Sequence, residues 1–83
     1  MVKVRLTAEA ANGLEDLPLV IHARLLRLLE RLERWPFVSG AKPLTGKLAG
    51  RYRLRTGDYR VQFCVKGQEV IVEKVGHRDR FYQ

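Results

Sequence analysis

Apolar and polar residues follow clear periods at the start of the chain. Residues 2–6 alternate between apolar and cationic side chains, which is the pattern of a strand with one buried face. Thr7 follows, a residue type that caps helices, and apolar residues then recur at helical spacing from Ala10 to Leu17. The pattern predicts a short strand and a first helix, which Gly13 weakens by about 1 kcal/mol relative to alanine.

The clearest helical pattern comes next. Apolar residues recur with heptad-like spacing from Ile21 to Trp35, and arginines occupy the opposite side of the helical wheel. Proline suits a first helical turn, where its missing N–H has no partner, so we predict a helix that begins near Pro18 and that Pro36 ends. Three leucines widen the apolar arc toward a second surface: Leu19, Leu26 and Leu29.

The rest of the chain reads as a loop followed by strands. Residues 36–50 are rich in glycine and proline and lack a period, which predicts a loop. Runs rich in β-branched and aromatic residues predict strands over residues 51–55, 59–65 and 70–75. The order β-α-α-β-β-β predicts an α+β fold, a mostly antiparallel sheet with both N-terminal helices packed on one face. With 83 residues, the chain has room for one domain, residues 1–83.

Charge narrows the class of partner. The chain has 16 Lys and Arg against 9 Asp and Glu, a net charge of +7, yet 46% of its residues are hydrophobic. This composition predicts a folded basic domain. Most of the positive excess lies in residues 42–83. Such a field favours a polyanion or an acidic protein partner, and charge alone does not choose between them.

Cysteine and histidine content limits the chemistry. Cys64 is the only cysteine, so no internal disulfide and no cysteine-based zinc site can form. With two histidines and no metal-ligand spacing, we expect no metal and no cofactor. The charged N-terminal residues and the lack of an apolar run of about 20 residues argue against a signal peptide and a membrane span, so we expect a cytoplasmic protein without a membrane partner.

The predicted hairpin gathers arginines on one face. The apolar residues of its two strands share a face only if the numbers of the paired residues sum to an odd value. A two-residue Thr56-Gly57 turn meets this condition and sets Arg53 opposite Arg60. Such a like-charge pair costs stability. Arginine binds phosphate through its planar fork of donors. We favour a phosphate-binding face free of acidic residues over a solvated outer face, because mixed charges would serve solubility better. Its members are Arg51, Arg53, Arg55 and Arg60.

A second group of candidates follows the last strand. RNA cleavage by the 2′-hydroxyl needs a base, an acid and cations that hold the phosphate. His77 is a candidate base or acid, Arg78 and Arg60 are candidate phosphate ligands, and Tyr82 can stack on a base or move a proton. Two alternatives stay open at this point: the segment is a polar chain end, and His77 anchors it through a hydrogen bond.

The residues resemble a known family. The run from Ala41 to Val61, which contains YRLRTGDYR at residues 52–60, and the later VGHR at residues 75–78 are similar to the RelE/ParE superfamily of toxins from type II toxin–antitoxin pairs. The similarity covers nearly the whole chain and implies the same β-α-α-β-β-β fold. RelE-type members cleave mRNA in the ribosomal A site, whereas ParE-type members inhibit DNA gyrase on a similar scaffold.

The resemblance also implies functional residues. Carried over by motif, Arg60, Arg78 and Tyr82 belong to the catalytic set, and His77 is common in the motif of many relatives. The resemblance and the charge pattern together give a set of candidate RNA-binding residues: Lys47, Arg51, Arg53, Arg55 and Arg80.

Three functional hypotheses follow. The leading one is a toxin that acts as a ribosome-dependent, metal-independent mRNA endonuclease and blocks translation. We expect a small acidic antitoxin to neutralise it by covering the basic face and the helices in a hetero-oligomer. The alternative is a ParE-like inhibitor of DNA gyrase without nuclease activity, and the third is a basic binding module without activity.

Overall fold

The computed structural model describes residues 2–81 and confirms the α+β order. The additions to the predicted elements are a two-residue strand and a 3₁₀ turn in the 36–50 loop and a short C-terminal helix. None of the helices in the described range is long and apolar enough to cross a membrane. In chain order the elements are β1 (Lys3–Leu6), α1 (Ala8–Glu15), α2 (Leu19–Leu32), β2 (Lys42–Pro43), η1 (Gly46–Leu48), β3 (Arg51–Thr56), β4 (Tyr59–Lys66), β5 (Glu69–His77) and α3 (Arg78–Phe81).

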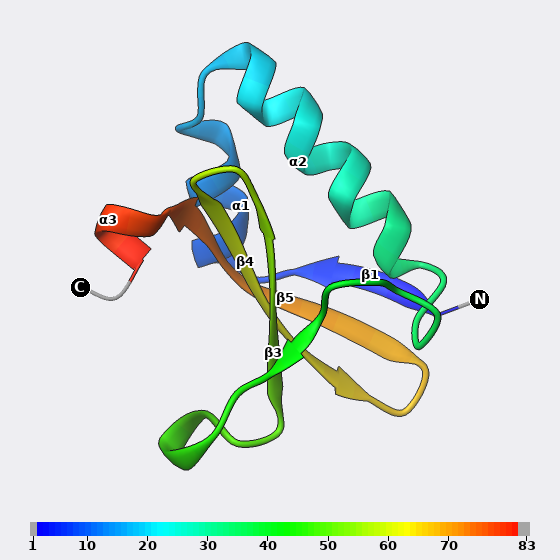
Figure 1. Cartoon of the computed structure of the whole chain (residues 1–83). Coiled ribbons are helices and arrows are strands. Elements are labelled where there is room, and N and C mark those ends of the chain that lie inside the picture. Colours follow the sequence, from blue (N-terminus) through cyan, green and yellow to red (C-terminus); the bar gives the residue numbers. More distant parts are fainter. Residues whose placement is uncertain (1, 82–83) are drawn as a thin grey trace.

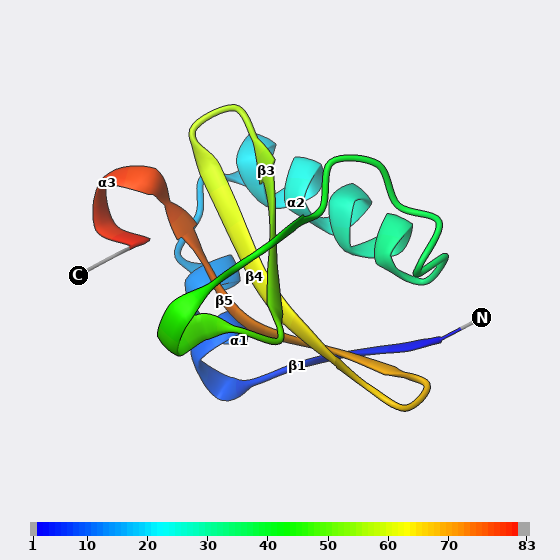
Figure 2. The same cartoon turned by 60° about the horizontal axis from the view of Figure 1, so that its bottom comes forward.

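One sheet of five strands carries the fold. Its strand order is β1-β5-β4-β3-β2 (Figure 1). The β2–β3, β3–β4 and β4–β5 pairs are antiparallel, and only the β1–β5 pair is parallel. Both α1 and α2 lie on one side of the sheet (Figure 2). The predicted architecture, a mostly antiparallel sheet with two helices on one face, is confirmed.

The first helix is capped as the sequence predicts. The Thr7 hydroxyl accepts the backbone N–H of Ala10 at 3.1 Å, and the helix buries Ala10 and Leu14. Gly13 faces β5 so closely that a Cβ there would lie 2.3 Å from the backbone oxygen of Val75. The glycine that weakens the isolated helix therefore permits its contact with the sheet.

The second helix is shorter than predicted. It begins at Leu19, with Pro18 as its N-cap, and ends at Leu32, so the prediction that it runs through Trp35 to Pro36 is wrong. After Leu32 the backbone tightens into turns, which turn Trp35 onto the core. The ring centroid of Trp35 lies 4.7 Å from that of Tyr52 and 5.3 Å from that of Phe63, both edge-on. This aromatic contact favours the early helix end over one more helical turn.

Helices and sheet bury a single hydrophobic core. The α2 leucines meet valines and one phenylalanine from the central strands β4 and β5. The largest side chains with essentially no exposure are Phe63, Leu25, Leu32, Val61, Val70 and Val72.

The β3–β4 hairpin has a different turn from the predicted one. Thr56 pairs with Tyr59, so the two turn residues are Gly57 and Asp58, and the Thr56-Gly57 turn is wrong. Gly57 has φ +58°, which only glycine adopts readily and which suits the first turn position of a tight hairpin. The change moves the register by two residues, so every side chain keeps its predicted face.

The strand β5 contains a β-bulge. Gln62 pairs with Lys74, but the next residue, Phe63, pairs with Val72, so Glu73 is an extra residue in β5. The bulge explains how Val72 and Val75, three residues apart, are both buried. It also sends Glu73 and Lys74 to the side of the sheet away from the helices.

Gly13 offers a test of this packing. Helix propensity alone predicts that Gly13→Ala stabilises α1 by about 1 kcal/mol. The close approach to the Val75 carbonyl predicts the opposite, a loss of about 1–3 kcal/mol, because backbone must shift to admit the methyl group. Urea unfolding followed by Trp35 fluorescence measures the difference. Asn12→Ala, on the exposed side of the same helix, serves as the matched control and should not destabilise.

Candidate nucleic-acid interface

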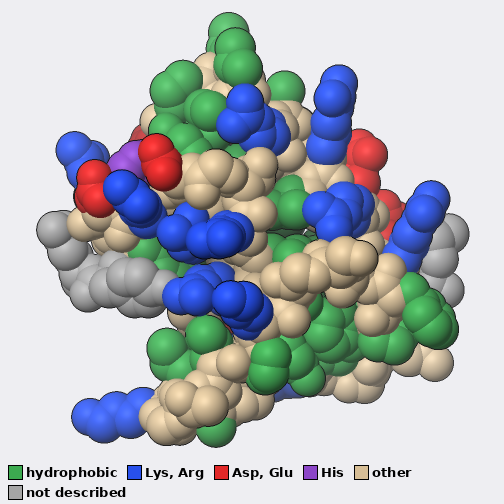
Figure 3. Space-filling view, in the orientation of Figure 1, with side chains coloured by type: hydrophobic (Ala, Val, Ile, Leu, Met, Phe, Trp, Pro, Cys, Tyr) green, Lys and Arg blue, Asp and Glu red, His purple; other side chains and the backbone are tan. Residues whose placement is uncertain are grey.

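The side of the sheet without helices is strongly cationic. Side chains alternate along each strand, so those next to the buried residues point away from the core. Lys and Arg side chains gather over the middle of this side (Figure 3). We call it the cationic face, and its Lys and Arg residues, taken from the strand registers, are Lys3, Arg5, Lys42, Arg51, Arg53, Arg55, Arg60, Lys66 and Lys74.

The expectation of a face without acidic residues is wrong. The bulge places Glu73 on it, where Oε1 accepts a hydrogen bond from Arg51 Nε at 2.8 Å and from Gln62 Nε2 at 3.3 Å. At the β1 edge, Glu69 pairs with Arg5 at 3.3 Å. Arg51, predicted as a phosphate ligand, is therefore already bound to a carboxylate.

A like-charge pair sits next to the hairpin turn. The pair is Arg55 opposite Arg60, where Arg53 was predicted to face Arg60. The guanidinium of Arg60 donates to the backbone oxygens of Gly57 at 3.1 Å and Tyr59 at 3.4 Å. Arg24 of α2 also reaches this turn, with Nη1 3.6 Å from the position of a Cβ on Gly57. Backbone carbonyls thus hold one cation of the pair and offset part of the repulsion.

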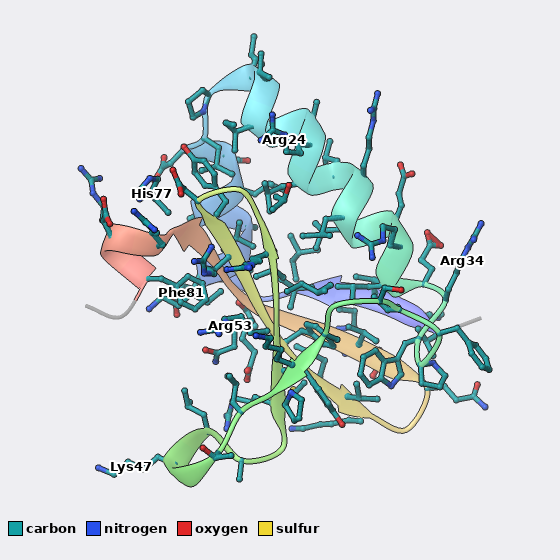
Figure 4. All side chains as sticks on the ribbon, in the orientation of Figure 1. Arg24, Arg34, Lys47, Arg53, His77 and Phe81 are labelled. Carbon is teal, nitrogen blue, oxygen red and sulfur yellow. The ribbon has the colours of Figure 1, made fainter. Side chains whose placement is uncertain are left out.

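Arg53 lies near the centre of the cationic face (Figure 4). It is half-buried and pairs across the sheet with Gln62 of β4 and Lys42 of β2. The short strand β2 therefore extends the face beyond the predicted residues.

His77 lies at the end of β5 and does not share the face of Arg60. It pairs with Tyr59, whose neighbour Arg60 points to the opposite side, and its ring meets that of Tyr59 edge-on at 5.1 Å. Its Nδ1 accepts the backbone N–H of Asp79 at 3.1 Å and lies 3.5 Å from the Asp79 carboxylate. This geometry favours the anchoring alternative, because the bond holds the first turn of α3.

Arg78 opens α3 beside the hairpin turn. Its backbone N–H donates to the Asp58 oxygen at 2.7 Å. Its Nε lies 3.8 Å from the Asp58 carboxylate and 3.7 Å from that of Asp79, with 57% of the side chain exposed. These distances and this exposure make the ion pairs weak, so Arg78 can exchange them for a phosphate.

A lysine of the cationic face fastens the other end of α3. Lys74 Nζ donates to the Phe81 backbone oxygen and lies 4.9 Å from the centroid of its buried ring. Beside α3, Arg80 lines a cleft of about 510 Å³ that also involves Leu17 and Tyr59. Helices this short do not form alone, so these contacts fix the segment that carries Arg78 and Arg80.

The remaining predicted residues lie apart from this group. Lys47 is exposed on η1 and projects away from the strands (Figure 4). Tyr82 lies outside the described residues. Within residues 2–81, no three His, Cys, Asp or Glu side chains form a group that could hold a metal ion.

Lys42, Glu73 and Lys74 are among the residues of the cationic face that the sequence prediction missed. Lys42 belongs to a strand of two residues, too short to leave a period. The other two carried a usable signal: Val70 and Val72 alternate, but the next valine is Val75, and the added residue marks a bulge.

The chain is similar to toxins of type II toxin–antitoxin systems. Residues 4–82 match the family described as ParE toxin of type II toxin-antitoxin system, parDE. A chain of the RelBE2 toxin–antitoxin complex from Mycobacterium tuberculosis is 32% identical, with a TM-score of 0.83 over 93% of this chain and 98% of that chain. No curated protein sequence matches.

Further solved structures share the fold. The archaeal RelE–RelB complex from Pyrococcus horikoshii matches at 28% identity and a TM-score of 0.74, covering 95% of this chain and 97% of that chain. The isolated E. coli RelE toxin matches at 18% identity and a TM-score of 0.79, covering 96% and 87%. At that identity the likeness shows the fold alone.

Fold and sequence together define the protein as a toxin of a type II toxin–antitoxin system. The chain belongs to the ParE toxin family of these systems. The resemblance to the RelE/ParE superfamily, predicted from the YRLRTGDYR and VGHR motifs, is confirmed.

The pKa of the Cys64 thiol responds to burial and to the nearby Glu73 carboxylate. Burial raises the pKa of the thiol, and the nearby Glu73 carboxylate raises it further, against smaller opposing effects of Lys66 and Arg51. The raised pKa keeps the thiol protonated at neutral pH. It therefore lowers the fraction of thiolate, which is the reactive form.

We predict slow alkylation of Cys64 in the folded protein. Between pH 7 and 9, iodoacetamide should react more slowly than with the urea-unfolded chain, and the pH profile should lie at higher pH. Glu73→Gln removes the carboxylate and should accelerate the reaction. A profile identical to that of the unfolded chain would contradict this account of the thiol's surroundings.

Proposed function

We propose that this toxin is a ribosome-dependent mRNA endonuclease of the cytoplasm that needs no metal. The observation that carries the proposal is the cationic face, on which Arg53, Arg55 and Arg60 lie on adjacent strands. A row of guanidinium groups on a sheet suits the closely spaced phosphates of a single strand.

The proposed reaction uses the RNA as its own nucleophile. The 2′-oxygen loses its proton and bonds to phosphorus, the bond from phosphorus to the 5′-oxygen breaks, and the leaving oxygen takes up a proton. Negative charge grows on the phosphate oxygens along this path. Arg60 and Arg78 are the proposed ligands of that charge, and their preorganised donors supply most of the rate.

Proton transfer has two candidate groups. His77 faces away from Arg60 and its Nδ1 is engaged with the Asp79 amide, so only Nε2 is available for proton transfer. Tyr82 is the second candidate. We propose anchoring of α3 as the main role of His77, with most of the rate supplied by the arginines and by positioning on the ribosome.

An antitoxin is the proposed protein partner. Besides the cationic face, the toxin exposes an apolar groove between β1 and α2, where Leu6 and Leu26 are 37% and 42% exposed. Leu19 is almost fully exposed, whereas Leu29, also predicted for this edge, is buried. We propose an acidic, amphipathic antitoxin chain that covers both surfaces and folds as it binds.

Inhibition of DNA gyrase is the second candidate function. The description of the matching family as ParE toxin favours it. The positive charge of the cationic face suits double-stranded DNA or an acidic surface of an enzyme as well as RNA. The fold alone does not decide which of these is the target.

Cleavage in a translating extract tests the proposal. Primer extension on the mRNA should show new 5′ ends when the toxin is added, and none on naked RNA. Arg60→Ala and Arg78→Ala should each lower the rate by about 10²–10³ through loss of a charged ligand of the transition state. His77→Gln should lower it far less if the histidine mainly anchors α3.

Arg34→Ala is the matched control, because Arg34 is exposed beyond the end of α2, away from Arg53 at the centre of the cationic face (Figure 4). It should cleave at the wild-type rate. An intact mRNA together with inhibited supercoiling by purified gyrase would replace the proposal with the second candidate.

A further inference from the structure

Glu73 is the carboxylate nearest the centre of the cationic face among the described residues. Its backbone is fixed by the bulge and by the Thr7 hydroxyl, which donates to the Glu73 oxygen at 3.0 Å while capping α1. Only 23% of its side chain is exposed. The fold therefore restricts the position of this carboxylate more closely than that of a fully exposed side chain.

The carboxylate binds its neighbours in a defined geometry. One oxygen, Oε1, accepts from both Arg51 Nε and Gln62 Nε2. The bond to Nε restricts the rotation of the Arg51 guanidinium, while its two terminal amino groups remain outside this contact. Arg51 is thereby a restrained fork, which loses less freedom on meeting a phosphate than a mobile side chain does.

Charge alone gives Glu73 the opposite effect. A carboxylate among cations weakens the attraction of the face for a polyanion, so its removal would tighten binding. Removal of the Glu73 carboxylate should therefore weaken RNA binding if its effect on orientation dominates, and tighten RNA binding if its charge dominates.

We propose that Glu73 is a positioning residue that holds Arg51 for a phosphate of the RNA backbone. This inference rests on the proposed function, because it takes RNA as the ligand of the face. In this inference Glu73 does not touch the RNA but orients Arg51, the residue that donates to the phosphate.

Binding of a fluorescent, unstructured single-stranded RNA by the full chain tests the inference without requiring cleavage. Glu73→Ala should weaken binding by roughly three- to tenfold, the contribution of one hydrogen bond of ordinary strength. Glu73→Gln keeps a carbonyl acceptor for Arg51 Nε and should restore wild-type or tighter binding. In an Arg51→Ala background, Glu73→Ala should have no further weakening effect.

Glu69→Ala is the matched control. Glu69 lies on the same face, but its partner Arg5 is 64% exposed and bound through a terminal nitrogen, so its removal should leave binding unchanged or slightly tighter. Thermal unfolding of each variant separates loss of binding from loss of fold, and the single and double variants are compared only below their transitions.

Three results would overturn the inference. The first is tighter RNA binding by Glu73→Ala, the result expected from charge alone. The second is equal weakening by Glu73→Ala with and without Arg51, and the third is an equal loss of affinity for a poly-glutamate peptide, which would assign the pair to an acidic protein partner. Cleavage of mRNA by a toxin that gives any of these results would leave the proposed function standing, whereas a wild-type toxin that binds no RNA would contradict both.

Discussion

Burial of one face of the sheet against α1 and α2 is the constraint on which the rest of the structure depends. Because side chains alternate along a strand, placing Leu54, Val61 and Phe63 in the core sends Arg53, Arg55 and Arg60 to the other side. A register slip of one residue would bury arginines, at a cost no small core could offset. The energetics of folding therefore also assemble the surface that we propose binds RNA.

The same constraint explains what could be predicted from the sequence. Alternation in residues 51–65 defines which side chains share a face, and that prediction holds although the turn was placed one residue too early. The face on which a side chain lies depends on whether the numbers of the two paired residues sum to an odd value. A register shift of two residues leaves that sum odd, so the faces are preserved. Which arginines stand opposite each other depends on the turn itself, so the Arg53–Arg60 pair was wrong and Arg55–Arg60 is found.

Features set by tertiary contact were beyond the sequence patterns. The end of α2 at Leu32 depends on where Trp35 meets Tyr52 and Phe63. The helix α3 depends on two hydrogen bonds of its backbone, one donated to His77 and one accepted from Lys74. The site shows the same division. The hairpin arginines were found from their spacing, whereas Glu73 reaches the face through a bulge, which interrupts the period of two. The carboxylate that orients Arg51 was for that reason missed.

The central claim is that the cationic face, with the adjoining end of α3, is where the toxin meets RNA. Amide chemical-shift changes on titration with a short single-stranded RNA test it most directly. The account predicts the largest changes in β3, β4, the Glu73–His77 end of β5 and α3, with α1 and the leucines of the β1–α2 groove unaffected. Changes concentrated in that groove, or none at salt concentrations low enough to favour polyanion binding, would contradict it.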